Sequence, residues 1–227
     1  MQENAALLPQ RDDLYTEYIT LLNLDGQYQK AYDCIMGHTF HPWEGGEGKI
    51  PAQYRLALMG LARAADDDTA LALLQQALTY PHNLGEGKLI GNLDNDLYEM
   101  IGELYAKRGD TARAEEAFRL AARGNFDLTG AIYYNDQPPQ MMYYAAKALA
   151  ALGETDEAKK RFAAFIDYAE AHRDDVMEIE YFAVSLPDFL IFEADLNKNN
   201  RVHCCLMEAL GLSLIHISEP TRPERIS

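Results

Sequence analysis

Apolar residues recur three and four positions apart along this chain, in pairs of short segments separated by a glycine or a run of aspartates. The clearest pair spans residues 98–121, and its spacing predicts two amphipathic helices whose apolar faces pack together. Gly102 lies on the first face without a side chain, so a neighbouring helix can approach it closely. Gly109 can end the first helix in a left-handed conformation, and Asp110 can cap the second. The apolar positions of this pair are Tyr98, Ile101, Tyr105, Ala114, Phe118 and Ala121.

Three other stretches fit the same template. Their matching positions are Tyr15, Tyr18, Leu22, Ala31 and Ile35 in the first pair, Tyr54, Ala57, Leu61, Ala70, Leu74 and Ala77 in the second, and Met142, Ala145, Leu149, Ala158, Phe162 and Phe165 in the fourth. The anchor alanines at 31, 70, 114 and 158 are 39, 44 and 44 residues apart. A fifth first helix is expected to begin near Asn199. Its apolar face should carry Val202, Cys205 and Leu206.

This periodicity predicts an all-α fold, a tetratricopeptide-like α-solenoid of antiparallel helix pairs over residues 1–211. A minimal unit of that kind has about 34 residues, so each unit here carries an insertion after its second helix. The four connectors are expected near residues 37–51, 79–94, 124–139 and 174–196. Because a solenoid repeats its geometry, these connectors should lie along one edge and touch in sequence. The concave face is expected to be lined by Thr16, Thr20, Arg55, Asp96, Glu99, Glu103, Tyr143 and Lys147.

The first two connectors share a sequence word. Gly46-Glu47-Gly48-Lys49 and Gly85-Glu86-Gly87-Lys88 are 39 residues apart, as are the first two anchor alanines, so the copies are in register. A phosphate-binding loop needs four residues between its first glycine and the Gly-Lys pair, and then Ser or Thr. Ile50 and Leu89 follow the two lysines instead, so nucleotide binding is not indicated. The glycines allow tight turns, with Glu and Lys either paired to neighbouring loops or contacting a ligand.

Aromatic side chains occur in all four connectors, and in the second and third they lie near Asn83, Asn135, Asp136 and Gln137. They suit a sugar site, in which rings stack on the sugar and amides take its hydroxyls, and they suit a protein interface equally well. A third interpretation is that the connectors pack on their own helices. The residues predicted to form a ligand or partner site along the connector edge are His41, Trp43, Glu44, Glu47, Lys49, His82, Asn83, Glu86, Lys88, Tyr133, Tyr134, Asn135, Asp136, Tyr181 and Asp188.

The composition of the chain excludes some classes of partner. The formal net charge is -16, and such a surface repels phosphate, so no nucleic-acid partner is expected. No apolar run is long enough for a membrane span, and the N-terminus lacks the features of a signal peptide, so a cytoplasmic protein without a membrane partner is predicted. The three cysteines are interpreted as small core residues, and the histidines show no metal-ligand spacing. No catalytic residue, cofactor or metal site is predicted.

The end of the chain reads differently. Residues 212–222 and 226–227 resemble one reading frame of a transposon-based sequencing adapter, with a variable index at 223–225. Residues 212–227 are therefore interpreted as a non-native read-through tail and excluded from fold reasoning. The native protein is then expected to have been cut near Gly211, within a helix, and the chain to be a fragment of a larger protein.

The connector sequences at 41–49, 83–88, 133–139 and 181–188 resemble the C-terminal array of large bacterial proteins. Those proteins are catalogued as a domain of unknown function followed by tetratricopeptide repeats. The resemblance implies a β-rich, mutarotase-like N-terminal part that this chain lacks, and a carbohydrate-linked role. Our leading hypothesis is a non-enzymatic scaffold that docks a protein partner, or its own missing N-terminal domain, through the connector edge. The alternative is a carbohydrate-handling protein whose aromatic connectors contact a sugar.

Overall fold

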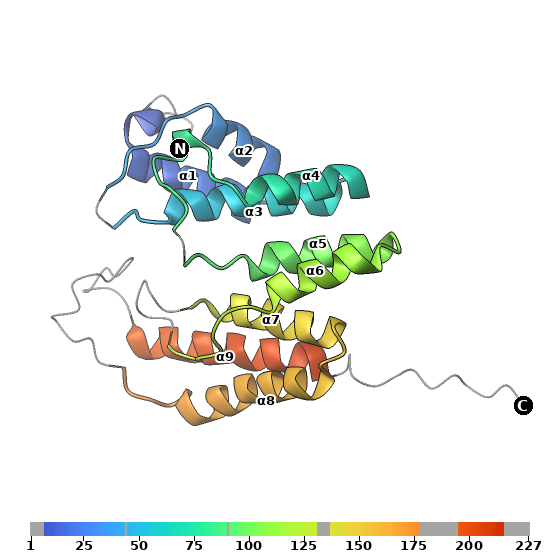
Figure 1. Ribbon diagram of the computed structural model, residues 1–227. Coiled ribbons are helices and arrows are strands. Elements are labelled where there is room, and N and C mark those ends of the chain that lie inside the picture. Colours follow the sequence, from blue (N-terminus) through green and yellow to red (C-terminus); the bar gives the residue numbers. More distant parts are fainter. Residues whose placement is uncertain (1–6, 44, 90, 131–136, 178–194, 216–227) are drawn as a thin grey trace, which may run out of the picture. The chain divides into compact units, whose positions relative to one another are not determined.

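The computed structural model describes residues 7–43, 45–89, 91–130, 137–177 and 195–215 (Figure 1). All regular structure in these ranges is helical, so the predicted all-α class is confirmed. The chain divides into two compact units, residues 1–114 and 115–227, and each is described by itself. The boundary falls inside helix α6 (Thr111–Ala121). Whether residues 1–211 form one continuous array stays a prediction.

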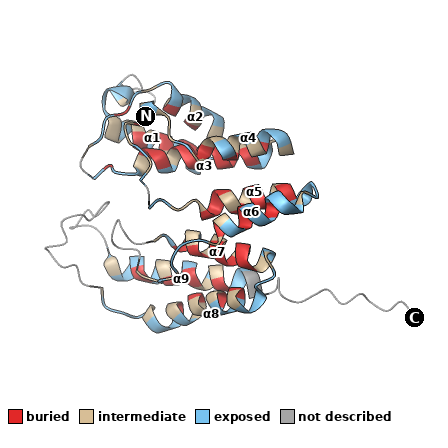
Figure 2. Ribbon diagram, in the orientation of Figure 1, coloured by how far each residue is buried: buried red, intermediate tan, exposed pale blue. Residues whose placement is uncertain are grey.

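Unit 1 is built from helices that pack in chain order. They are α1 (Asp12–Leu24), α2 (Tyr28–Met36), α3 (Lys49–Ala64), α4 (Asp67–Ala77), the short 3-10 helix η2 (His82–Leu84) and α5 (Asn95–Lys107). Each α-helix from α1 to α4 packs on the next, and α1 also contacts α3. α3 lies in the middle of these contacts, and most of its residues are buried (Figure 2).

The predicted turns are present. Gly26, Gly109 and Gly153 all have φ between 73° and 84°, the left-handed conformation in which a side chain is disfavoured. The turn of the second pair has no glycine and uses Asp66, whose carboxylate accepts the backbone N–H groups of Asp68 and Thr69 at 3.1 Å. The helix boundaries therefore follow from local sequence signals.

Unit 2 contains the rest of α6 with α7 (Pro139–Ala151), α8 (Thr155–His172) and α9 (Leu196–Ile215). α8 packs extensively on both α7 and α9. Gly211 lies where α9 meets α8, since a Cβ there would stand 2.8 Å from the Phe162 carbonyl oxygen. One buried cluster of unit 2 consists of Met142, Phe165, Ala169, Cys204 and Met207.

The fifth first helix differs from its prediction. α9 begins at Leu196, and Val202, Cys205 and Leu206 are exposed, whereas Cys204 and Met207 are buried. The predicted face was wrong because apolar residues occur around much of this helix, and no following helix of a pair fixed the register. The cysteines also differ from their interpretation, since only Cys204 is a core residue; Cys34 is half-buried. α9 continues past Gly211 to Ile215.

Within the described ranges, no helix combines the length and the apolar character that crossing a membrane requires.

Candidate functional site

Asn83 joins the second connector to the first. Its side-chain amide nitrogen donates to the carbonyl oxygens of Ile35 at 2.7 Å and His38 at 2.9 Å, at the C-terminal end of α2. The backbone N–H of Phe40 donates to the Asn83 carbonyl oxygen at 2.8 Å. The last carbonyls of a helix have no partner within that helix, so a side chain 48 residues away donates to the Ile35 carbonyl here. The first two connectors therefore contact each other, as predicted.

A second link lies beside the shared sequence word. Glu86 Oε2 accepts the backbone N–H of Gly48 at 2.8 Å, so this glutamate does pair with the neighbouring loop. Gly85 has φ 74°, and a Cβ there would stand 2.4 Å from the Phe40 carbonyl oxygen. Only glycine fits this conformation and this close approach.

The two in-register words nevertheless have different conformations. The left-handed residue is Gly48 in the first copy but Gly85 in the second, and these are not equivalent positions. Lys49 begins α3 directly, whereas Lys88 lies seven residues before α5 begins at Asn95. The second connector contains η2, and its backbone follows a different path from that of the first. The two identical sequence words therefore have different structures.

Trp43 is half-buried against its own connector. A Cβ at Gly46 would fall 2.1 Å from the indole ring, so the ring covers the Gly46 backbone. The Gly46 N–H also donates to the Trp43 carbonyl oxygen at 3.0 Å. The first glycine of the word is therefore required by the tryptophan that precedes it.

Asp12 fixes the start of the first connector to α1. Its carboxylate lies 2.7 Å from His38 Nε2 and accepts the backbone N–H of His41 at 2.7 Å. Burial alone would raise the pKa of Asp12, but the hydrogen bonds from His38 and His41 outweigh it, so this pKa lies below its ordinary value. The His41 ring remains 80% exposed despite its 3.3 Å contact with the same carboxylate.

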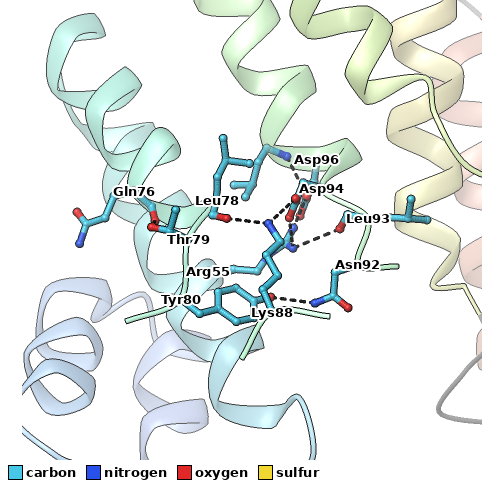
Figure 3. A network of polar contacts seen from close by, with 11 residues as sticks. Arg55, Gln76, Leu78, Thr79, Tyr80, Lys88, Asn92, Leu93, Asp94 and Asp96 are labelled. Atoms are coloured by element: carbon cyan, nitrogen blue, oxygen red, sulfur yellow. Dashed lines mark hydrogen bonds and ion pairs between the residues drawn. The ribbon is translucent and has the colours of Figure 1, made fainter. Parts of the chain in front are cut away.

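A buried ionic cluster supports the second connector (Figure 3). Arg55 of α3 donates to Asp94 at 2.8 Å and to Asp96 at 2.5 Å, and Lys88 donates to the second oxygen of Asp94 at 2.5 Å. The side chains of Arg55, Asp94 and Asp96 are at most 10% exposed. Two cations thus balance two carboxylates. Desolvation lowers the pKa of Arg55, but the charges of Asp96 and Asp94 raise it more, so the guanidinium stays charged.

Lys88 has further partners in this cluster. Its ammonium donates to the Leu78 carbonyl oxygen at 2.8 Å, next to the C-terminal end of α4, and lies 5.6 Å from the centre of the Tyr80 ring. A cation at a helix C-terminus is favoured by the helix dipole. Lys88 therefore connects the loop to the end of α4 and the start of α5, and its positive charge is paired within the protein.

The predicted site residues fall into three groups. Asn83, Glu86 and Lys88 make internal contacts. His41, Glu47 and His82 are exposed, Trp43 is half-buried, and Lys49 begins α3. The remaining candidates lie outside the described residues: Glu44, Tyr133, Tyr134, Asn135, Asp136, Tyr181 and Asp188. Contact of the first two connectors with the third and fourth stays a prediction.

Sequence reasoning missed the residues that hold this edge together. Four residues expected on the concave face are buried: Thr16, Arg55, Asp96 and Glu99. Burial of Arg55 follows from its two carboxylate partners. No repeat spacing pairs them, because Arg55 and Asp94 are 39 residues apart whereas the second and third anchor alanines are 44 apart.

No group of three or more potential metal ligands is assembled among the residues that the structure places. Neither the comparison with protein-family models nor the comparison with solved structures gave a match.

Proposed function

We propose that this chain is a tetratricopeptide-like repeat scaffold, without catalytic activity of its own, that binds a protein partner at the connector edge. We define the connector edge as residues 37–48 and 79–94. The repeat architecture is supported by the chain-order packing of α1 to α5 and by the glycine turns at regular positions. The partner is a separate protein, or another domain of a longer chain to which these residues belong.

One observation carries this proposal: the edge is folded, yet it leaves side chains exposed where a partner can reach them. Asn83 and Glu86 join the two connectors, and Arg55 and Lys88 hold the second in place through their contacts with Asp94. His41 and His82, each next in sequence to a residue of the Phe40–Asn83 hydrogen bond, are exposed. A surface held in place before binding loses less entropy when a partner binds.

Carbohydrate binding is the second candidate, and Trp43 favours it. A half-exposed indole can stack on the apolar face of a sugar. The donors expected to take sugar hydroxyls are less suited, because both hydrogen bonds of the Asn83 amide nitrogen already go to backbone carbonyls. We therefore rank a protein partner first.

Photo-cross-linking tests the proposal at single positions. A photoreactive amino acid replaces Glu47 or His82, both exposed on the connector edge, and a matched control carries it at Lys160, exposed on α8. The full chain is irradiated in an extract of cells that produce it, and adducts are identified by mass spectrometry. We expect one protein to be cross-linked from both edge positions and not from Lys160.

A glycan array read with the same full-length chain separates the two candidates. Sugar binding that His41→Ala and Trp43→Ala abolish, together with no edge-specific protein adduct, would replace the protein-docking proposal with the carbohydrate one. Equal cross-linking from Glu47 and Lys160 would show that the edge has no special role.

A further inference from the structure

A groove of about 310 Å³ lies among α3, α4 and α5, between the second and third helix pairs. Its apolar lining includes the buried Ala62, Ala70 and Leu74 and the half-buried Met100 and Leu104. Small-molecule sites commonly have this size, with an apolar lining and a few polar groups. The described residues that line the groove all lie outside the connector edge, so it is a separate candidate site.

The interface between the first and second helix pairs shows what fills the equivalent place. There the ring of Tyr28 of α2 lies on Gly60 of α3, where a Cβ would come within 2.3 Å of the ring. One repeat later, the matching positions are Asp67 of α4, 39 residues after Tyr28, and Leu104 of α5, 44 residues after Gly60. Both of these residues line the groove. An aromatic ring therefore fills this place in the first interface, whereas the second interface has a carboxylate at the position of the ring.

Asp67 and Leu104 leave the groove open. The Asp67 carboxylate lies 2.6 Å from Lys107 Nζ of α5, and the two side chains are 35% and 68% exposed, so this ion pair lies at the rim. Leu104 is half-buried and takes only part of the space that a ring takes in the first interface. The groove is therefore an aromatic position of the repeat that the described residues leave unfilled.

The charges of the groove favour an anionic ligand. Its charged lining residues are Arg63, Asp67, Glu103 and Lys107. Asp67 and Lys107 neutralise each other, and Glu103 also has an interaction within the protein. Arg63 is exposed, and among the described residues none forms a hydrogen bond or an ion pair with its guanidinium. A guanidinium can bind a carboxylate through two parallel hydrogen bonds, so Arg63 provides an anchor for a carboxylate beside the apolar lining.

We infer that this groove binds a small aromatic carboxylic acid. The ring of the ligand takes the place that Tyr28 takes in the first interface and contacts Leu74 and Leu104, while its carboxylate accepts hydrogen bonds from Arg63. The formal charge of -16 disfavours anions in general, so a carboxylate alone is not retained. Binding therefore requires the ring and the guanidinium together.

Titration of the full, isotope-labelled chain with phenylacetate, followed by NMR, tests the inference. We expect saturable chemical-shift changes at the backbone amides of residues 67–74 and 100–107, which carry the groove lining of α4 and α5. Acetate lacks the ring and phenylacetamide lacks the charge, so each should bind at least about tenfold more weakly. Cyclohexylacetate keeps the charge but has a puckered ring, and it should also bind more weakly than phenylacetate.

Two variants separate the contributions of charge and space. Arg63→Gln should weaken phenylacetate binding at least about tenfold and leave phenylacetamide binding unchanged. Leu104→Trp fills the groove and should abolish binding of both. Arg201→Gln, at an exposed arginine of α9, is the matched control and should bind phenylacetate like the unmodified chain. Circular dichroism checks that the variants fold. The inference is overturned if the groove amides show no saturable shifts, if acetate or cyclohexylacetate binds as well as phenylacetate, or if Arg63→Gln binds phenylacetate normally.

Discussion

Arg55 is the buried cation of the ionic cluster that supports the second connector. Its charge is buried and is balanced by Asp94 and Asp96 on another segment. Such a cluster is weak evidence for stability as a whole, because desolvation offsets the attraction, but removing one member leaves an uncompensated buried charge. The cluster therefore specifies where the second connector lies more than it adds net free energy.

Arg55→Ala should lower the free energy of unfolding by about 3–5 kcal/mol, because Asp96 loses its buried cation and Asp94 keeps only Lys88. Urea denaturation measures this change. Arg63→Ala on the same helix is the matched control, since Arg63 is exposed, and it should cost within about 0.5 kcal/mol. Equal losses in the two variants would contradict the role assigned to the cluster.

Asp12 makes the stability depend on pH. Its pKa in the folded protein lies below the ordinary 3.8, so the stabilisation is fully present above that value and is lost as pH falls through the folded pKa. The difference in unfolding free energy between the unmodified chain and Asp12→Ala should therefore shrink below about pH 4. Asp127→Ala, at an exposed carboxylate before α7, is the matched control. A difference that grows on acidification would contradict this assignment.

At the scale of elements, Asn83 of the second connector donates hydrogen bonds to the C-terminal end of α2, which belongs to the first helix pair. Asn83→Ala leaves the carbonyl groups of Ile35 and His38 without that donor and should cost about 1–3 kcal/mol. Hydrogen exchange should rise at the amide of Phe40, whose bond to the Asn83 carbonyl depends on the same loop position. Asn92→Ala removes only an exposed 3.3 Å bond to Tyr80 and serves as the control. Unchanged exchange at Phe40 would show that the backbone bond holds the connectors without the side chain.

Local sequence signals predicted the helices well, but they could not predict the contacts that hold the connectors in place. Helix faces and turns depend on residues a few positions apart, as at Gly109 and Asp110, so they can be read from sequence. The Asn83 and Arg55 contacts join residues 39 to 48 positions apart, and no periodicity marks an asparagine as a cap for a distant helix. The α9 face was misassigned for a related reason: its register depends on α8, through contacts such as Gly211 on Phe162.

At the scale of the whole molecule, the formal charge of -16 is the dominant electrostatic feature. Like charges on a folded chain repel one another and destabilise the compact state, whereas partly exposed ion pairs such as Lys107–Asp67, at 2.6 Å, contribute little. Both effects are screened by salt, but the repulsion involves many more charges.

The temperature of unfolding should therefore rise as NaCl increases from about 0.02 M to about 0.5 M, because screening relieves more repulsion than attraction. Differential scanning calorimetry at low protein concentration measures this rise without a contribution from association. The loss caused by Arg55→Ala should stay nearly constant over the same range, since buried charges are screened much less than exposed ones. A midpoint that falls with salt would mean that surface ion pairs, and not the excess of acidic residues, govern the stability of this chain.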